Sequence, residues 1–125
     1  MKNGKHVILC VDDDADYLNV LKILIAGGGY IGETAGGGEE GLRTFRAVEP
    51  DLLLVDLMME EIDSGALMVK EIRALGSKAP AFLLSSVGDN LNISTDYSTL
   101  GLSGVLQKPV DKDVLLATLK AKLKK

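Results

Sequence analysis

The chain has 125 residues, of which 46% are hydrophobic and 26% are charged, and its formal net charge is −4. This composition is typical of a folded globular protein of about one domain and excludes a disordered chain. The acidic balance argues against direct nucleic-acid binding, which needs a basic face to neutralise phosphates. No run approaches the roughly 18 apolar residues of a membrane span, and the start of the chain has no signal-peptide pattern, so we expect a cytoplasmic protein without membrane contact.

Apolar runs of strand length alternate with segments of helical periodicity along the whole chain. Short runs rich in Val, Ile and Leu favour buried strands, whereas apolar residues three or four positions apart favour amphipathic helices. In chain order we expect a strand at His6–Val11, a helix at Ala15–Ala26, a strand at Tyr30–Ala35, a helix at Glu39–Val48, a strand at Leu52–Val55, a helix at Ala66–Leu75, a strand at Ala81–Leu84, a polar and weakly helical segment at Asp89–Leu100, a strand at Ser103–Gln107 and a last helix after Asp111.

Four residue positions mark the expected helix ends. Asp14 and Asp111 are predicted to be N-caps, because a carboxylate there accepts hydrogen bonds from the first backbone amides of the helix. Glycines from Gly27 onward end the first helix, and Pro50 ends the second.

The periodicity also predicts which side chains enter the core. In the third helix we expect Met68, Ile72 and Leu75 to face inward. The single cysteine, Cys10, lies in an apolar strand and cannot form an internal disulfide, so we expect a buried and inert thiol. His6 has no companion at metal-ligand spacing and is expected to be structural.

Five strand-helix units in about 125 residues indicate an α/β fold with an open parallel sheet and helices on both faces. A closed barrel would need eight such units and about twice the residues. Parallel strands need crossover helices, so both faces of the sheet are covered and the strands read as continuous apolar runs.

Charged residues directly follow three of these strands. Asp12, Asp13 and Asp14 follow the first, Asp56 follows the third and Lys108 follows the fifth. Ligands of open α/β sheets bind outside the carboxyl ends of the strands. The sequence therefore predicts that carboxylates and an ammonium group converge at one edge of the sheet and form a site.

Four segments resemble the receiver domain of the response regulators of bacterial two-component signalling. They are Val11–Asp14, Pro50–Met59, Leu84–Ser86 and Gln107–Pro109, in the family's order and at nearly its spacing. The resemblance covers essentially the whole chain and implies a single receiver domain over residues 1–125. It further implies a flavodoxin-like (βα)5 doubly wound parallel sheet with strand order 2-1-3-4-5 and three α/β/α layers.

The resemblance implies that Asp56 accepts a phosphoryl group from a histidine kinase or a histidine phosphotransfer protein. A carboxylate nucleophile needs the phosphoryl oxygens neutralised, and a divalent cation held by carboxylates does this. We expect Mg²⁺, or Mn²⁺, with Asp13 and Asp56 as direct ligands, Asp12 acting through water and the backbone carbonyl of Met58 completing the set.

Lys108 and Ser85 are expected to contact oxygens of the transferred phosphoryl group, the first as a point charge and the second as a hydroxyl donor. Pro109 fixes the chain after Lys108, and a cis bond there is one option. The resemblance implies a switch that catalyses its own phosphorylation and dephosphorylation rather than a conventional enzyme. It also implies a downstream protein partner and a monomer, or a dimer formed on phosphorylation.

Three features depart from the family pattern. Receivers commonly carry an aromatic residue three positions before the lysine, where this chain has Val105. Glu60 and Glu61 add negative charge to the loop after the acceptor. The segment Val87–Thr99 is one residue longer than usual and weakly helical, which suggests an order change on phosphorylation or partner binding.

Other interpretations remain open. A run of aspartates is often a solvated turn, and Lys108 could be a plain salt-bridge partner of Asp56. A receiver-fold module that binds a partner constitutively, without a switch, is the main alternative function. A flavin-binding protein of similar topology is disfavoured because the acidic first loop would repel a phosphate. The glycine triplets match neither a P-loop nor a dinucleotide-binding fingerprint.

Overall fold

The structure is a computed structural model that describes residues 4–56, 64–85 and 103–123. Its sheet has five parallel strands in the order β2-β1-β3-β4-β5. The strands are β1 (Val7–Val11), β2 (Ile31–Ala35), β3 (Leu52–Asp56), β4 (Ala81–Ser85) and β5 (Gly104–Gln107). The helices are α1 (Ala15–Gly27), α2 (Gly38–Val48), α3 (Ser64–Ala74) and α5 (Lys112–Lys122).

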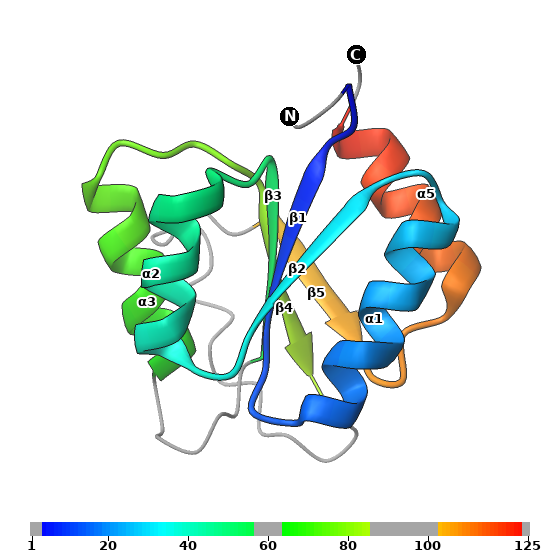
Figure 1. Cartoon of the computed structure of the whole chain (residues 1–125), viewed down its shortest axis with the longest axis horizontal. Coiled ribbons are helices and arrows are strands. Elements are labelled where there is room, and N and C mark those ends of the chain that lie inside the picture. The colour runs from blue at the N-terminus through cyan, green and yellow to red at the C-terminus, as the bar shows by residue number, and fades with distance from the viewer. Residues whose placement is uncertain (1–3, 57–63, 86–102, 124–125) are drawn as a thin grey trace.

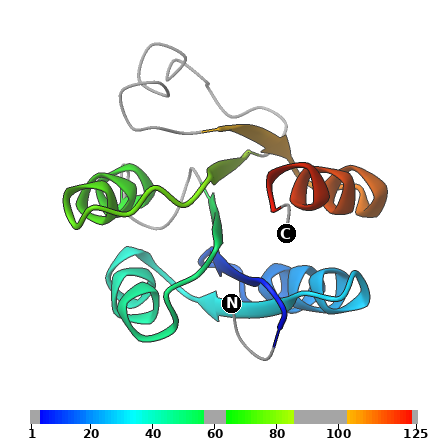
Figure 2. The same cartoon turned by 90° about the horizontal axis from the view of Figure 1, so that it is seen from above.

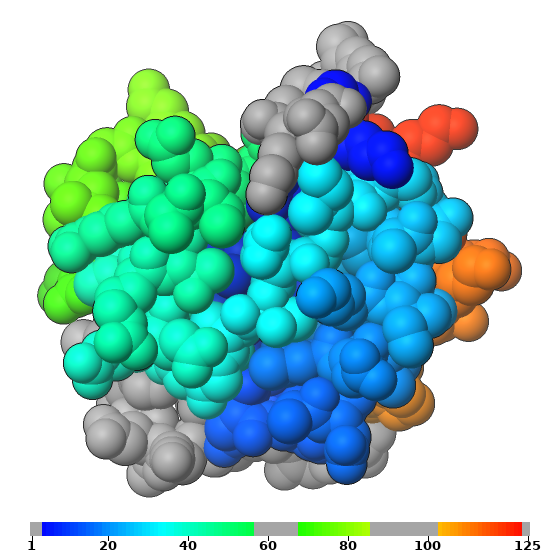
Figure 3. All heavy atoms as spheres, in the orientation of Figure 1, coloured from blue at the N-terminus to red at the C-terminus, as the bar shows by residue number. Residues whose placement is uncertain are grey.

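The helices form two layers with the sheet between them. In both cartoon views α1 and α5 cover one face of the sheet, while α2 and α3 cover the other (Figures 1 and 2). The strand β2 is one edge of the sheet and reaches the surface between α2 and α1 (Figure 3). This arrangement confirms the expected flavodoxin-like fold and its strand order.

The buried strands divide their side chains between two cores with a period of two. In β1, Ile8 and Cys10 belong to the core beneath α1 and α5, whereas Leu9 and Val11 belong to the core beneath α2 and α3. Successive side chains of a strand point to opposite faces, so a strand covered on both sides must be apolar throughout. This requirement explains why β1 and β3 read as unbroken apolar runs.

Both predicted N-caps are confirmed. The Asp14 carboxylate accepts hydrogen bonds from the amides of Asp16 and Tyr17, at 3.0 and 3.2 Å. The Asp111 carboxylate accepts one from the amide of Val114 at 3.1 Å. These bonds satisfy amides that have no partner inside the helix, and they fix where α1 and α5 begin.

The third helix differs from its prediction at both ends. It begins at Ser64 rather than Ala66 and ends at Ala74, and Leu75 is 53% exposed rather than buried in the core. Met68 and Ile72 are buried as expected. Leu75 follows the last residue of α3 and lines a surface pocket with Phe45 and Arg46, and Gly76, whose φ is +93°, then turns the chain.

The register of the strands brings their carboxyl ends to one edge. Val11 pairs with Val55, Asp56 pairs with Leu84, and Ser85 at the end of β4 pairs with Gln107. The arrowheads of β4 and β5 point to this same end of the molecule (Figure 1). Asp12 after β1, Asp56 at the end of β3 and Lys108 after β5 are therefore neighbours.

Several predictions lie outside the described residues and remain predictions. They concern Met58, Glu60 and Glu61 in the loop after β3, the helix expected at Asp89–Leu100 and the segment Val87–Thr99. In the part of the chain that is described, every helix is too short or too polar to cross a membrane.

Candidate functional site

Three carboxylates meet at the carboxyl edge of the sheet. Asp12 directly follows β1 and is fully buried, Asp56 is the last residue of β3 and is 3% exposed, and Asp13 is exposed to solvent. One oxygen from each carboxylate lies within 4.8 Å of the other two. The structure therefore brings together all three of the carboxylates that the sequence predicted to bind a metal.

The backbone around Asp12 fixes its side chain. Its amide donates to the carbonyl of Ala35 at 3.1 Å, which extends the β1–β2 pairing by one residue. Its Oδ1 accepts a hydrogen bond from the amide of Asp14 at 2.9 Å. A short aspartate side chain commonly bonds its own backbone two residues on, and here that bond orients the carboxylate as the chain turns into α1.

Lys108 supplies the positive charge of the site. Its Nζ lies 2.5 Å from Oδ2 of Asp12 and 3.3 Å from Oδ1 of Asp56. The sequence had suggested a pair with Asp56, and that contact is present, but the shorter contact is with Asp12. Burial alone would lower the pKa of Lys108, but the hydrogen bond to Asp12 and the charges of Asp12 and Asp56 outweigh burial and raise it.

Backbone contacts place Lys108 at the end of β5. Its amide donates to the carbonyl of Ser85 at 2.6 Å, and the peptide bond to Pro109 is cis. Ser85 itself is 2% exposed at the end of β4, one residue beyond the partner of Asp56 in the register. Val105, where the family commonly has an aromatic residue, is half-buried against the core beneath α2 and α3.

Tyr17 is a residue of this site that the sequence did not point to. Its ring centroid lies 4.8 Å from Nζ of Lys108, and its hydroxyl oxygen accepts a hydrogen bond from the amide of Val110 at 3.1 Å. Burial raises the pKa of Tyr17, so its phenol is neutral at ordinary pH. The only signal in the sequence was its position in the first turn of the helix that follows the aspartates.

The donor set suits a hard divalent cation. Mg²⁺ and Mn²⁺ prefer oxygen ligands, and Mg²⁺ in particular is commonly bound by one or two carboxylates together with water and phosphate oxygens. Asp12, Asp13 and Asp56 offer three such carboxylates in one small volume, and the exposure of Asp13 leaves a side open to solvent.

Cys10 lies beside this site but does not take part in it. Burial, with a smaller effect from the charge of Asp12, raises the pKa of its thiol to about 12. A thiol that is protonated at neutral pH and fully buried is a weak nucleophile and a poor ligand. The expectation that Cys10 is buried is confirmed, and the inertness of its thiol stays a prediction.

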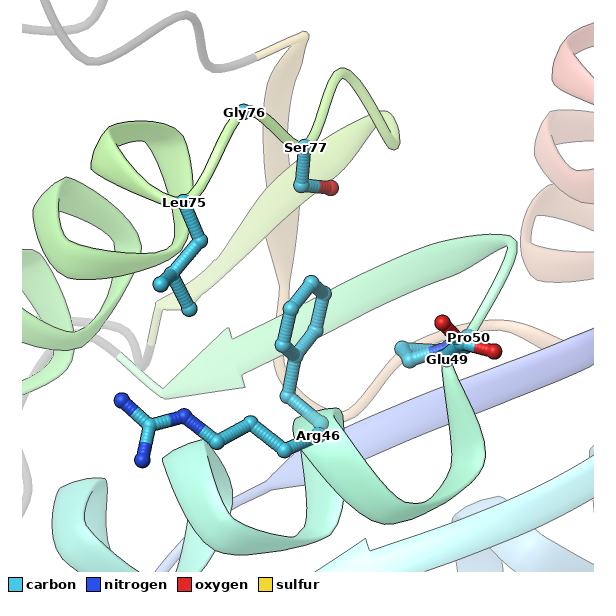
Figure 4. A pocket seen from close by; sticks show the side chains of 7 residues that line it. Arg46, Glu49, Pro50, Leu75, Gly76 and Ser77 are labelled. Carbon is cyan, nitrogen blue, oxygen red and sulfur yellow. The ribbon is translucent and has the colours of Figure 1, made fainter.

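A pocket of about 410 Å³ lies at the opposite end of the sheet, where β3 and β4 begin. It is lined by Phe45, Arg46, Glu49, Pro50, Leu75, Gly76 and Ser77. Figure 4 shows that the side chains of Arg46 and Glu49 extend in different directions. The described lining of this pocket therefore lacks the converging charges that distinguish the carboxyl edge.

Comparison with known proteins agrees with this geometry. A family model described as "Response regulator receiver domain" matches residues 8–120. The chain belongs to the response regulator receiver domain family, whose members act in two-component signalling.

Two curated relatives and two solved structures illustrate the similarity. The transcriptional regulatory protein ZraR of Escherichia coli K12 is 34% identical over 116 residues, which are 93% of this chain and 26% of the relative. The probable transcriptional regulator ycf27 of Guillardia theta is 33% identical over 97% of this chain and 46% of the relative. The chain thus spans about a quarter to a half of the length of these relatives.

Among solved structures, the Vibrio cholerae chemotaxis protein CheY4 superposes with a TM-score of 0.86 at 25% identity, over 96% of this chain and 100% of that one. A CheY-like receiver domain protein of Methanospirillum hungatei JF-1 gives a TM-score of 0.85 at 25% identity, over 95% and 94% of the two chains.

Proposed function

We propose that Asp56 accepts a phosphoryl group from the phosphohistidine of a histidine kinase or a histidine phosphotransfer protein, and that the chain acts as a phosphorylation-dependent switch. The observation that carries this proposal is the cluster of Asp12, Asp13 and Asp56 at one sheet edge, with the ammonium of Lys108 against two of its members. A merely structural module gains nothing from holding like charges together, because their repulsion costs stability.

In the proposed reaction an oxygen of the Asp56 carboxylate attacks the phosphorus. A new oxygen–phosphorus bond forms while the nitrogen–phosphorus bond of the phosphohistidine breaks, and the imidazole leaves and takes up a proton. Asp56 is held as the last residue of β3, and only 3% of its surface is exposed, so little water reaches its carboxylate. Attack of water on the same phosphorus later returns the carboxylate and inorganic phosphate.

The proposed function includes the binding of a divalent cation. Asp12, Asp13 and Asp56 would hold Mg²⁺ or Mn²⁺, with the carbonyl of Met58 as a further ligand. When bound, the cation supplies neutralisation of the phosphoryl oxygens and aligns them with the acceptor. Lys108 would move its ammonium from the carboxylates to a phosphoryl oxygen, and the Ser85 hydroxyl would donate to another.

A phosphate-affinity gel tests the assignment. The protein is incubated with acetyl phosphate and Mg²⁺, and we expect a retarded band that Asp56→Asn abolishes. Asp113→Asn, which removes an exposed carboxylate in the first turn of α5, is the matched control and should still shift. A wild-type protein that never shifts would favour the constitutive module, and a shift that survives in Asp56→Asn would place the acceptor elsewhere.

The same samples address the output of the switch. Light scattering coupled to size-exclusion chromatography, with and without the phosphoryl group, would distinguish a constant monomer from a dimer formed on phosphorylation. The downstream partner is proposed to be a protein that binds the phosphorylated form preferentially.

A further inference from the structure

Tyr17 joins the first and last loops of the site. It lies in the first turn of α1, and its two contacts reach the chain on both sides of Pro109. The ring faces the ammonium of Lys108 at 4.8 Å, and the hydroxyl accepts from the amide of Val110 at 3.1 Å. One side chain therefore restrains both ends of a three-residue segment that is about 90 residues away in sequence.

The position of Tyr17 is itself fixed by the aspartate run. The carboxylate of Asp14 accepts from the amide of Tyr17, and the amide of Asp14 donates to the carboxylate of Asp12. Asp12 and Tyr17 thus belong to one hydrogen-bonded turn, and both contact the ammonium of Lys108. The turn after β1 therefore contacts Lys108 in two ways, directly through Asp12 and through the ring of Tyr17.

We propose that Tyr17 is a positioning residue that holds the Lys108 ammonium at the Asp12–Asp56 pair. The inference rests on the proposed function, because the group that benefits is the one that would contact the phosphoryl oxygens. A lysine has a flexible four-carbon stem and three rotatable donors, so its side chain alone does not define one direction. The aromatic face attracts the cation, and the hydroxyl fixes the backbone from which the stem begins.

The two contacts can be removed separately. Tyr17→Phe keeps the ring and removes the hydroxyl, whereas Tyr17→Leu removes both and keeps apolar volume. We expect Tyr17→Leu to slow phosphorylation by acetyl phosphate about fivefold, the effect of a partly desolvated cation–π contact, and Tyr17→Phe to slow it by a smaller factor. Thermal melting of each variant shows how much of its population is folded at the assay temperature.

A double-mutant cycle separates positioning from general packing. Each Tyr17 variant is combined with Lys108→Ala, and the rate of phosphorylation is compared in the two backgrounds. If Tyr17 acts through Lys108, the substitution of Tyr17 has no further effect once the lysine is gone. An equal loss in both backgrounds would overturn the proposal, because a purely structural role does not depend on the lysine.

A second measurement does not require phosphorylation. The ring should displace the NMR resonances of the Lys108 side-chain methylene protons in the wild type and in Tyr17→Phe, and the displacement should vanish in Tyr17→Leu. Tyr30→Leu is the matched control, since Tyr30 faces His6 rather than Lys108 and should leave those resonances unchanged.

The rate measurement and the NMR measurement together distinguish a failure of this inference from a failure of the proposed function. Resonances of Lys108 that are identical in the wild type and Tyr17→Leu would overturn the positioning role, whatever the rates. A wild type that takes up no phosphoryl group, yet shows the displaced resonances, would instead contradict the proposed function and leave Tyr17 as the residue that holds the lysine.

Discussion

The ammonium group of Lys108 compensates the negative charges of Asp12 and Asp56. It lies between two carboxylates that are almost completely buried, and its own side chain is 15% exposed. Removing one partner of a buried ion pair leaves an uncompensated charge, which is far more costly than an unmade surface pair.

We therefore expect Lys108→Ala to lower the free energy of unfolding by about 3 kcal/mol in metal-free buffer. Added Mg²⁺ should restore more stability to this variant than to the wild type, because a cation would replace the missing charge. Urea unfolding followed by circular dichroism, with chelator and with Mg²⁺, measures both effects. Lys112→Ala removes an exposed lysine nearby and should change little, and equal midpoints for the two variants would contradict the interpretation.

The buried thiol of Cys10 should make the free energy of unfolding fall as pH rises. Its pKa is raised to about 12 by burial, whereas an unfolded thiol ionises near pH 8.5. The folded state therefore keeps its proton over a range where the unfolded state loses it, and the contribution to stability is complete below about pH 8.5 and falls as pH rises towards the folded pKa.

The free energy of unfolding should thus fall by up to about 1.4 kcal/mol per pH unit above that point, and this component should be missing in Cys10→Ala. Urea unfolding at several pH values measures the difference in slope. Labelling with a thiol reagent provides an independent check, since the native protein should react only as fast as it unfolds. Rapid labelling of the folded protein at neutral pH would show that the thiol is accessible.

At the scale of elements, α2 packs closely against α3 and the sheet at Gly41. Gly41 is buried in α2, and a Cβ there would lie 2.5 Å from Sδ of Met68 and 3.1 Å from Cγ2 of Val11. The sulfur is the flexible end of a side chain and can move, but the valine is held in the buried strand β1. A glycine at this position lets α2 lie against both α3 and the sheet.

Gly41→Ala should destabilise the protein by about 1 kcal/mol, because overpacking costs about 1–3 kcal/mol and the better helix propensity of alanine returns about 1 kcal/mol. Gly27→Ala is the matched control, since a Cβ at that helical position meets nothing within 4 Å. Chemical denaturation of both variants decides the point. A Gly41→Ala protein as stable as Gly27→Ala would mean that α2 can shift without cost.

At the scale of the whole molecule, metal binding and folding should be linked. The cation ligands come together only in the folded chain, so Mg²⁺ should stabilise the folded state by about 1.4 kcal/mol for each tenfold increase in concentration above the dissociation constant. Asp13→Asn should remove much of this effect while leaving the metal-free stability nearly unchanged, because Asp13 is exposed. Melting curves over a Mg²⁺ series measure it, and an undiminished gain in Asp13→Asn would exclude that carboxylate as a ligand.

The sheet and the gathering of charges could be predicted because both follow from local patterns. An unbroken run such as Leu52–Val55 can only be a strand covered on both faces, and parallel strands place the residues after them at one edge. Asp12, Asp56 and Lys108 were found in this way. The cap at Asp14 was equally local, since it needs only the next three residues.

The remaining details depend on contacts between distant segments. Leu75 fits the helical spacing, and only the left-handed conformation of Gly76 shows that the helix has already ended. Lys108 lies closer to Asp12 than to Asp56, although both carboxylates are within its reach. No sequence pattern predicts which of the two makes the shorter contact. Tyr17 contacts residues about 90 positions away, so its spacing in α1 gave no sign of them.

The register of β3 and β4 has a consequence for a divided chain. All three carboxylates of the site lie before the α3–β4 connection and Lys108 lies after it, while Leu53 pairs with Ala81 across that boundary. Two fragments produced by a cut after Ser77 would each be inert under the proposed mechanism. If acetyl phosphate turnover returns when the two fragments are mixed, the fragments have reassociated into the folded domain. Phosphorylation of Asp56 would then serve as a fragment-complementation assay for the fold.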